Sequence, residues 1–355
     1  MIYDLWFTIA QQTNVNFLTV ANVTKALHFG FCLKLFRLNL PLMKCYKDLS
    51  ALPKFKNAVV TIGTFDGVHL GHQQILAQLK AEAKRIGGET VIITFNPHPR
   101  KIVSSIPGDI KLITTQKEKR NLLKKAGIDH LVIVPFNYQF ANQSAEQYIV
   151  NFLYEYFKPH TIVIGYDHRF GKDRAGDYLL LELKGKELGF VVKEIPEHIL
   201  TEAKISSTNI RQSLLQSDIE TANALLGYDY FFEGLVIEGN KLGRTIGYPT
   251  ANLHIENEEK LIPGNGVYAV RVEVVSRESL AGSFVGMMNI GVRPTVDGKK
   301  RMIEVNIFDF NKDIYGETLR VSITHYIRGE VKFNGLEELK TQLEKDRFAA
   351  MKLLK

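Results

Sequence analysis

The sequence predicts a two-domain α/β protein: a doubly wound parallel sheet, followed by an antiparallel β-barrel with a terminal helix. Three observations lead to this fold class. The chain has 355 residues, which is enough for two ordinary domains. Strand and helix patterns alternate up to about residue 210, which is typical of a parallel sheet. After residue 231 short strands follow one another between glycines and prolines, which is typical of a small barrel.

The composition is that of a globular protein, with 45% hydrophobic and 23% charged residues. The net charge is +7, but lysines and arginines form no block, so we expect no nucleic-acid partner. No apolar run reaches about 18 residues, so we expect no membrane span. Cys32 and Cys45 are the only cysteines, which excludes a disulfide framework and favours a cytoplasmic protein. Nothing in the sequence indicates an oligomeric state.

Residues 1–42 show neither a clear hydrophobic period nor the pattern of a signal peptide. We expect an N-terminal extension that is disordered or lies upstream of a true start at Met43. The alternative is a membrane-surface role for a short amphipathic stretch at 29–42, which carries Lys34 and Arg37.

The first predicted domain covers residues 43–210. Apolar, β-branched runs predict its strands, and apolar positions at helical spacing predict its helices. The predicted strands are 58–62, 90–95, 131–134, 161–164 and 191–195. The predicted helices are 72–86, 117–126, 144–157 and 178–188. Ligands of such sheets bind at the carboxyl ends of the strands, where we expect the site.

Residues 211–230 are predicted to be a helical connector, with one helix over 211–226. The second domain covers residues 231–355. Its predicted strands are 232–238, 266–275, 284–290, 301–307 and 318–327, and a helix over 336–354 closes the chain.

The strongest local signal is the segment from Thr64 to His72, between the first strand of the domain and its first helix. The N–H groups and the dipole of a helix start favour a bound phosphate. His69 and His72 are three residues apart, so both can donate to one phosphate as charge develops. The alternatives are a helix cap with incidental histidines, or a zinc site, which lacks a third ligand nearby.

A second signal is the segment Ile-Ser-Ser-Thr-Asn-Ile-Arg at residues 205–211. The hydroxyls of Ser207 and Thr208, a helix start and the guanidinium of Arg211 would form a clamp for polyphosphate. The alternative is a helix cap at Ser207 or Thr208, followed by a surface arginine.

Two further stretches follow predicted strands and should line the same crevice. The first contains Asn96, His98 and Pro99, and the second contains Asp167, Arg169 and Phe170. The alternative for the first stretch is that its prolines only shape a turn.

In the second domain, residues 243–252 form a loop in which Gly243 and Gly247 can offer backbone N–H groups to phosphates. The oxygens of Thr250 and Asn252 suit a hard Mg²⁺ ion. No Walker A motif occurs, so a kinase of this sequence is not of the P-loop type. Glu304 lies on an alternating strand, and the pattern alone would make it an ordinary outward charge.

Taken together, these motifs resemble the prokaryotic bifunctional riboflavin kinase/FAD synthetase (FMN adenylyltransferase) family, from about Met43 to the C-terminus. The first domain is similar to the nucleotidyltransferase superfamily, whose His-x-Gly-His motif binds ATP. The resemblance implies catalytic roles for His69, His72, Arg211 and Glu304, the last as the base of the kinase. It implies ATP or phosphate contacts for Gly63, Phe65, Gly71, Ser207, Thr208, Gly243 and Gly247. It implies flavin contacts for Asn96, His98, Pro99, Asp167, Arg169 and Phe170, and Mg²⁺ at Thr250 and Asn252.

The resemblance implies that the second domain phosphorylates riboflavin to FMN, and that the first transfers AMP from ATP to FMN to give FAD. ATP with Mg²⁺, riboflavin and FMN would be its small-molecule partners. One alternative is an adenylyl- or cytidylyltransferase for another phosphorylated molecule, with a non-catalytic barrel. The other is a flavin-binding protein without turnover.

Overall fold

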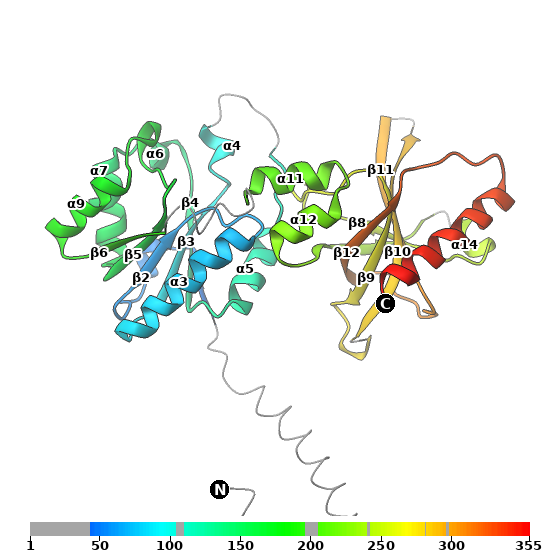
Figure 1. The fold of residues 1–355 in the computed structure, drawn as a ribbon, viewed down its shortest axis with the longest axis horizontal. Coiled ribbons are helices and arrows are strands. Elements are labelled where there is room, and N and C mark those ends of the chain that lie inside the picture. The colour runs from blue at the N-terminus through cyan, green and yellow to red at the C-terminus, as the bar shows by residue number, and fades with distance from the viewer. Residues whose placement is uncertain (1–42, 104–109, 196–204, 240–241, 281, 296–297) are drawn as a thin grey trace, which may run out of the picture. The chain divides into compact units, whose positions relative to one another are not determined.

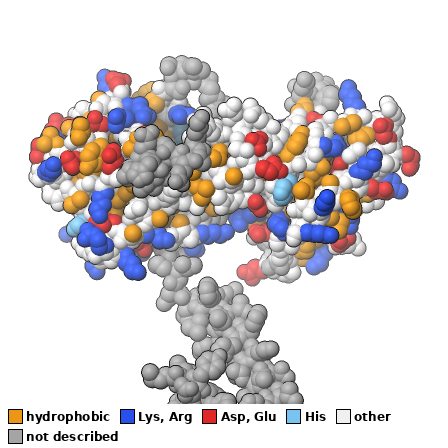
Figure 2. All heavy atoms as spheres, in the orientation of Figure 1, with side chains coloured by type: hydrophobic (Ala, Val, Ile, Leu, Met, Phe, Trp, Pro, Cys, Tyr) orange, Lys and Arg blue, Asp and Glu red, His pale blue; other side chains and the backbone are white. Residues whose placement is uncertain are grey.

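The computed structural model describes residues 43–103, 110–195, 205–239, 242–280, 282–295 and 298–355 (Figure 1). The extension expected at 1–42 lies outside these residues. No helix in the described part of the chain is long and apolar enough to cross a membrane. Acidic and basic side chains are interspersed on the face shown in Figure 2.

The first half of the described chain is a six-stranded parallel sheet in the order β1-β4-β3-β2-β5-β6. Its strands are β1 (Lys44–Tyr46), β2 (Val59–Ile62), β3 (Thr90–Asn96), β4 (His130–Pro135), β5 (Thr161–Gly165) and β6 (Val191–Ile195). Every residue of β2 is buried, as expected for a central strand. From β2 the chain runs to β3 and β4 on one side, and later to β5 and β6 on the other. The switch point of this doubly wound sheet therefore lies beside β2.

Helices and helical turns connect these strands, and α3 packs on β2 and β5 (Figure 1). They are η1 (Leu49–Ala51), α3 (Leu70–Ile86), α4 (Arg100–Val103), α5 (Gln116–Lys125), α6 (Tyr138–Ala141), η3 (Lys172–Arg174) and α9 (Tyr178–Leu188). The helix predicted over 144–157 is α7 (Ala145–Gln147), a π-helical segment η2 (Tyr148–Tyr154) and α8 (Glu155–Phe157). The extra residue per turn in η2 keeps Tyr148 and Phe152 in the core, where their rings lie 5.2 Å apart.

The prediction of one helix over 211–226 is wrong. The structure has two helices, α11 (Ser207–Leu215) and α12 (Ile219–Leu226). Ser217 has a left-handed backbone with φ of 64°, and Asp218 caps α12 by accepting from the N–H of Thr221. The apolar pattern continues through this break, so helical spacing alone did not reveal it.

The second half of the described chain is a closed antiparallel barrel in the order β10-β11-β8-β7-β12-β9. Its strands are β7 (Tyr230–Ile237), β8 (Ala251–His254), β9 (Gly266–Val274), β10 (Ser283–Thr295), β11 (Gly298–Ile307) and β12 (Thr318–Arg328). Two short helical turns, α13 (Leu242–Thr245) and η4 (Glu278–Leu280), interrupt it, and α14 (Leu336–Leu353) follows β12. The prediction missed β8, which has only four residues, and ended β10 too early. The predicted fold class is confirmed.

The apolar core of the barrel extends beyond the barrel itself. It contains inward residues of the strands, such as Phe232 and Val305, and it also contains Ile219 and Leu226 of α12. Ile113, from the segment before α5, belongs to the same cluster. The connector helices and part of the first half therefore pack into the core of the second half.

Candidate active sites

The loop between β2 and α3 carries the predicted histidine motif in an unusual backbone. Phe65 and Val68 have φ of 47° and 39°, although neither is a glycine, and Gly67 has φ of 84°. A left-handed residue of this kind costs about 1–3 kcal/mol, so the surroundings must hold the loop in place. Tyr228 Oη donates to the carbonyl of Gly67 at 2.6 Å, and Gln73 Nε2 donates to that of Val68 at 3.0 Å.

The two predicted histidines lie together at the start of α3. His69 is the N-cap residue, and its Nδ1 accepts from the N–H of His72 at 3.4 Å. The two rings stack with centroids 3.7 Å apart. Burial lowers the pKa of His69 to about 4, and it lowers the pKa of His72 well below the usual value of a histidine. Both imidazoles are therefore neutral at pH 7, and each carries one N–H that can donate to a ligand.

The glycines of this loop allow the close packing around the histidines. A Cβ at Gly71 would lie 3.3 Å from His69 Nδ1, and one at Gly63 would lie 3.1 Å from the ring of Phe65. The ring of Phe65 is in turn 4.9 Å from that of His72. The predicted nucleotide contacts Gly63, Phe65 and Gly71 therefore lie against the histidine pair.

The second predicted motif lies against the same loop. Arg211 forms an ion pair with Asp66, Nη2 to Oδ2, at 2.6 Å, and its side chain is only 12% exposed. The hydroxyl of Ser207 donates to the carbonyl of Asp66 at 3.0 Å. The alternative of a surface arginine is therefore wrong. The cap at Ser207 or Thr208 is wrong as well: the helix cap is Ser206, which accepts from the N–H of Asn209, and Thr208 is exposed in the first turn of α11.

Asp66 is a residue that the sequence interpretation did not single out. Burial alone would raise its pKa, but Arg211 and the N–H groups of Thr114 and Ile113 outweigh burial and hold the pKa below its usual value. Those N–H groups lie 2.9 and 3.1 Å from the carboxylate. Asp66 is therefore an ionised anchor that joins Arg211 to the segment before α5.

Lys119 was also missed, because it lies in a charged stretch of α5 that looks like an exposed helix face. Its side chain is buried, and its Nζ donates to the carbonyl of Thr64 at 2.7 Å. Burial lowers the pKa of Lys119 to about 8, although Asp66 opposes this shift. No pattern in the sequence marks this contact, which depends on the packing of α5.

The predicted flavin contacts lie on the loops after β3 and β5. These strands are the two neighbours of β2, so their loops flank the histidine loop at one edge of the sheet. Asn96 is exposed at the end of β3, and His98 and Pro99 are half-buried after it. Burial lowers the pKa of His98 to about 4, and the charges of Asp66 and Arg211 also act on it.

On the loop after β5, Asp167 and Arg169 are exposed, whereas Phe170 is buried. Its ring stacks on that of Tyr148 with centroids 5.2 Å apart, inside the core of the first half. Phe170 therefore supports the loop from the core in this structure.

A groove with a volume of about 370 Å³ lies beside the second motif. Most of its lining surface is apolar, and two arginines are among the residues that line it. The lining residues are Arg100, Ile110, Thr208, Arg211, Gln212, Leu215 and Gln216. Two guanidinium groups and a hydroxyl suit an anionic ligand such as a phosphate.

In the barrel, two neighbouring strands bring the predicted kinase residues together. Glu304 on β11 lies directly opposite Asn252 on β8, so the two side chains share one face. Ile303 and Val305 point the other way, into the core. Thr250 lies just before β8, and the carbonyl of Tyr248 would be only 2.2 Å from a Cβ at Gly243. Gly247 turns the same loop with φ of 84°.

Asn306 is the residue of this site that the sequence interpretation missed. It lies two positions after Glu304 on the same face of β11 and is 5% exposed. Its Nδ2 donates to the carbonyl of Pro249 at 2.7 Å, which fixes the orientation of the amide. Alternation along the strand was the signal that could have identified it.

The site fits a hard cation. Asn252 and Asn306 each bury an Oδ1 that has no hydrogen-bond partner within the described residues. Unpartnered buried acceptors are rare and call for a ligand. Amide, hydroxyl and carboxylate oxygens are the ligands that Mg²⁺ takes, together with water and phosphate. Within the described residues, no group of three or more histidine, cysteine or acidic side chains is arranged to hold a metal ion.

Two family models match the chain, one on each half. The model described as FAD synthetase matches residues 52–209, and the model described as riboflavin kinase matches residues 226–354.

Curated relatives are similar over most of the chain, and each is named a bifunctional riboflavin kinase/FMN adenylyltransferase. The protein of Haemophilus influenzae is 38% identical over 82% of this chain and 92% of the relative. That of Listeria monocytogenes is 41% identical over 82% of this chain and 90% of the relative. That of Escherichia coli K12 is 35% identical over 87% of this chain and 96% of the relative.

A solved structure, described as a macrolide-efflux protein from Streptococcus pneumoniae, has a similar fold. It is 33% identical to this chain with a TM-score of 0.77, over 87% of this chain and 99% of that one. The curated relatives and both family models agree on the two halves, and the chain belongs to the bifunctional riboflavin kinase/FMN adenylyltransferase family.

Proposed function

We propose that this chain makes FAD in two steps at two separate sites. The barrel phosphorylates riboflavin with ATP and gives FMN and ADP. The parallel-sheet domain then transfers AMP from a second ATP to FMN and releases pyrophosphate. The observation that carries the proposal is the pairing of Glu304 with Asn252 in one family-matched segment and of His69 with His72 in the other.

In the kinase step, Glu304 takes the proton of the ribityl 5′-hydroxyl of riboflavin. The hydroxyl oxygen forms a bond to the γ-phosphorus of ATP, and the bond from that phosphorus to the bridging oxygen breaks to leave ADP. Gly243 and Gly247 offer backbone N–H groups to the phosphates. Thr250, Asn252 and Asn306 would hold Mg²⁺, and the bound ion neutralises phosphate charge. The unpartnered amide oxygens support this assignment.

In the adenylyl-transfer step, a phosphate oxygen of FMN attacks the α-phosphorus of ATP, and pyrophosphate leaves. His69 and His72 donate N–H groups to the phosphate oxygens as charge develops. Ser207, Thr208 and Arg211 hold the leaving pyrophosphate, and the groove that Arg100, Thr208 and Arg211 line supports this role. The backbone at Gly63, Phe65 and Gly71 contacts ATP.

We place the flavin of FMN between the loops after β3 and β5. Asn96, His98, Pro99, Asp167 and Arg169 line that position, with Phe170 as support from the core. The sheet order, which puts both loops beside the histidine loop, supports this placement.

The proposed domain limits are 43–210 for adenylyl transfer, 211–230 for the connector and 231–355 for the kinase. We also propose that residues 1–42 are dispensable, because none of the motifs lies there, and that the protein is cytoplasmic, as its two cysteines suggest. A chain that begins at Met43 should keep both activities, and loss of either activity would contradict the limit at 43.

The test is to incubate the purified protein with riboflavin, ATP and Mg²⁺, and to separate the flavins by chromatography. FAD should accumulate after FMN, and EDTA should stop FMN formation. FMN that is never converted would refute the transferase half. Unchanged riboflavin, with FAD formed from added FMN, would refute the kinase half. Flavin binding without either product would indicate the non-catalytic alternative.

A further inference from the structure

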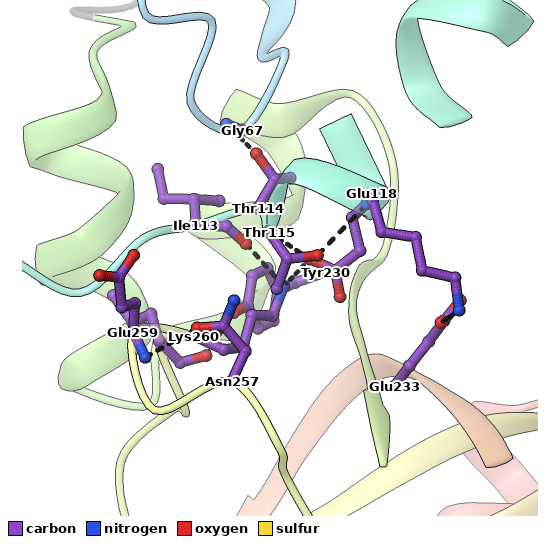
Figure 3. Close-up of polar contacts among 12 residues, drawn as sticks. Gly67, Ile113, Thr114, Thr115, Glu118, Tyr230, Glu233, Asn257, Glu259 and Lys260 are labelled. Carbon is purple, nitrogen blue, oxygen red and sulfur yellow. Dashed lines mark hydrogen bonds and ion pairs between the residues drawn. The ribbon is translucent and has the colours of Figure 1, made fainter. Parts of the chain in front are cut away.

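The most deeply buried lysine contact outside the proposed sites joins the two halves of the described chain (Figure 3). Lys260, in the loop between β8 and β9, has a side chain only 1% exposed. Its Nζ donates to Glu118 Oε2 at 2.7 Å and to the carbonyl of Ile113 at 2.7 Å. The ring of Tyr230 lies 4.7 Å from the same Nζ. Burying the ammonium group of Lys260 costs desolvation free energy, which its partners must offset.

The backbone around this lysine is paired with the first half of the chain. The N–H of Leu112 donates to the carbonyl of Glu259 at 2.7 Å, and the N–H of Leu261 donates to the carbonyl of Leu112 at 2.8 Å. Residues 111–115 are therefore held by the second half on one side, through two backbone hydrogen bonds and the ammonium group of Lys260.

On the other side, the same segment holds the histidine loop. The N–H groups of Ile113 and Thr114 donate to the carboxylate of Asp66, the partner of Arg211. The hydroxyl of Thr114 accepts from the N–H of Gly67 at 3.0 Å (Figure 3). Residues 111–115 thus lie between Lys260 and the loop that carries His69.

Glu118 makes a second connection of the same kind. Its Oε2 also accepts from the N–H of Thr115 at 2.8 Å, which closes the capping box of α5. The next residue of that helix, Lys119, donates to the carbonyl of Thr64 at the start of the histidine loop. Lys260 therefore holds the glutamate of the capping box at the start of α5, and α5 supports the loop.

We propose that Lys260 is a positioning residue for adenylyl transfer, supplied to that site by the kinase half of the chain. It touches neither ATP nor flavin, and it acts through Ile113 and Glu118 on Asp66, Gly67 and Thr64. This inference rests on the proposed function. A misplacement of catalytic groups by about 1 Å can cost on the order of 10²-fold in rate, so a support at this distance can matter.

The first variant is Lys260→Met in the full chain. We expect kcat for FMN adenylylation to fall by about 10- to 100-fold. KM for FMN should change less than kcat, and riboflavin phosphorylation should stay within a few-fold of the wild-type rate. Because Lys260→Met leaves the carboxylate of Glu118 buried and unpaired, this variant can also lose stability.

The second variant, Lys260→Met with Glu118→Gln, separates position from stability. It leaves no unpaired charge, and glutamine still closes the capping box of α5. It lacks the ammonium group that donates to the carbonyl of Ile113 and to the side chain at position 118. We expect a melting temperature near that of the wild type and the same loss of kcat for adenylylation.

Two matched controls make the test specific. Lys117, on the same helix, also pairs with the second half of the chain, at 2.7 Å from Glu233, but its side chain is 70% exposed. Lys117→Met should leave both activities within a few-fold. Glu118→Gln alone should lower kcat for adenylylation less than the double variant does, because Lys260 still donates to the carbonyl of Ile113.

A double variant with wild-type melting and wild-type adenylylation would overturn the positioning role. The role would also be overturned if a folded double variant lost both activities to the same extent. It would likewise be overturned if Lys117→Met lost as much adenylylation as the double variant. A wild-type chain that makes no FAD would refute the proposed function itself, whereas normal FAD synthesis in the double variant refutes only the role of Lys260.

Discussion

The two proposed sites are built from opposite kinds of polar group. At the histidine loop the charged side chains already have partners within the protein: Arg211 pairs with Asp66, and Lys119 donates to Thr64. The barrel site instead leaves two buried amide oxygens, those of Asn252 and Asn306, without a partner in the described residues. The histidine loop pairs its charged side chains within the protein, although His72 Nδ1 is buried without a partner in the described residues. The barrel site leaves acceptor oxygens unpaired.

This difference indicates what each site is built to receive. The histidine loop presents N–H donors and neutral imidazoles, which suit the spread negative charge of a transferring phosphate. The barrel site presents acceptor oxygens and a carboxylate, which suit a cation and a hydroxyl proton. Variants can therefore break one site by removing a donor and the other by removing an acceptor.

The largest effect is expected at Glu304. Glu304→Gln keeps the shape of the side chain and removes its basicity, so riboflavin phosphorylation should fall by about 10²- to 10⁴-fold. Adenylylation of supplied FMN should stay near normal. Steady-state rates of the two half-reactions measure both effects. Near-normal phosphorylation in this variant would return Glu304 to an ordinary outward charge.

The next largest effect is expected at His72, whose N–H is proposed to donate to the phosphate oxygens. His72→Ala should lower the conversion of FMN to FAD by about 10²- to 10³-fold, the usual effect of losing one such donor. Phosphorylation of riboflavin serves as the internal control and should stay within a few-fold. If both activities fell in parallel, the two sites would not be separate, or the fold would be damaged.

A smaller effect is expected from an acceptor at Asn306. Asn306→Ala removes both the oxygen proposed to face Mg²⁺ and the support of the Pro249 carbonyl. We expect the Mg²⁺ concentration needed for half-maximal phosphorylation to rise by about 10- to 100-fold. Initial rates across a Mg²⁺ titration measure this. An unchanged Mg²⁺ dependence would remove Asn306 from the cation site, and adenylylation should not change.

The smallest effect concerns pH and the buried histidines. His69, His98 and His168 each have a pKa lowered to about 4, chiefly by burial, whereas an unfolded histidine titrates near 6.5. Between these values the unfolded chain binds more protons, so stability should fall as the pH falls from 6.5 towards 4. Melting temperatures at pH 7 and pH 5 should show this loss, at about 2–4 °C per kcal/mol for a domain of this size.

His168→Phe isolates one contribution to that loss. His168 packs beside Phe170, and its Nε2 is buried with no partner in the described residues. The variant has one titrating group fewer, so its melting temperature should drop less between pH 7 and pH 5. A drop as large as that of the wild type would mean that His168 titrates normally.

The strands and the motifs could be predicted because their signals are local. The apolar runs of β3 and β5 and the alternation of β11 are visible in a few residues, and the histidine motif is contiguous. The break between α11 and α12 was missed because the apolar spacing continues through it, although Ser217 and Asp218 are typical residues for such a break.

The missed site residues have no local signal of their own. Lys119 looks like part of a solvated helix face, and Asp66 looks like one more residue of a loop. Their roles arise from contacts with residues far along the chain, such as that between Asp66 and Arg211, which only the fold brings together. Tertiary packing determines the roles of Lys119 and Asp66, and a short stretch of sequence carries no pattern that would reveal them.

The shared apolar core also has a consequence for how genes of this kind can change. Ile113, Ile210 and Leu214 are fully buried in the cluster that fills the barrel. If the gene were divided into two, these side chains would be exposed to water. Exposure costs a free energy of roughly 25 cal/mol for each Å² of apolar surface. A fission event therefore has to be followed by new polar residues on both halves. Without them, each of the two separate proteins would expose an apolar patch that promotes aggregation.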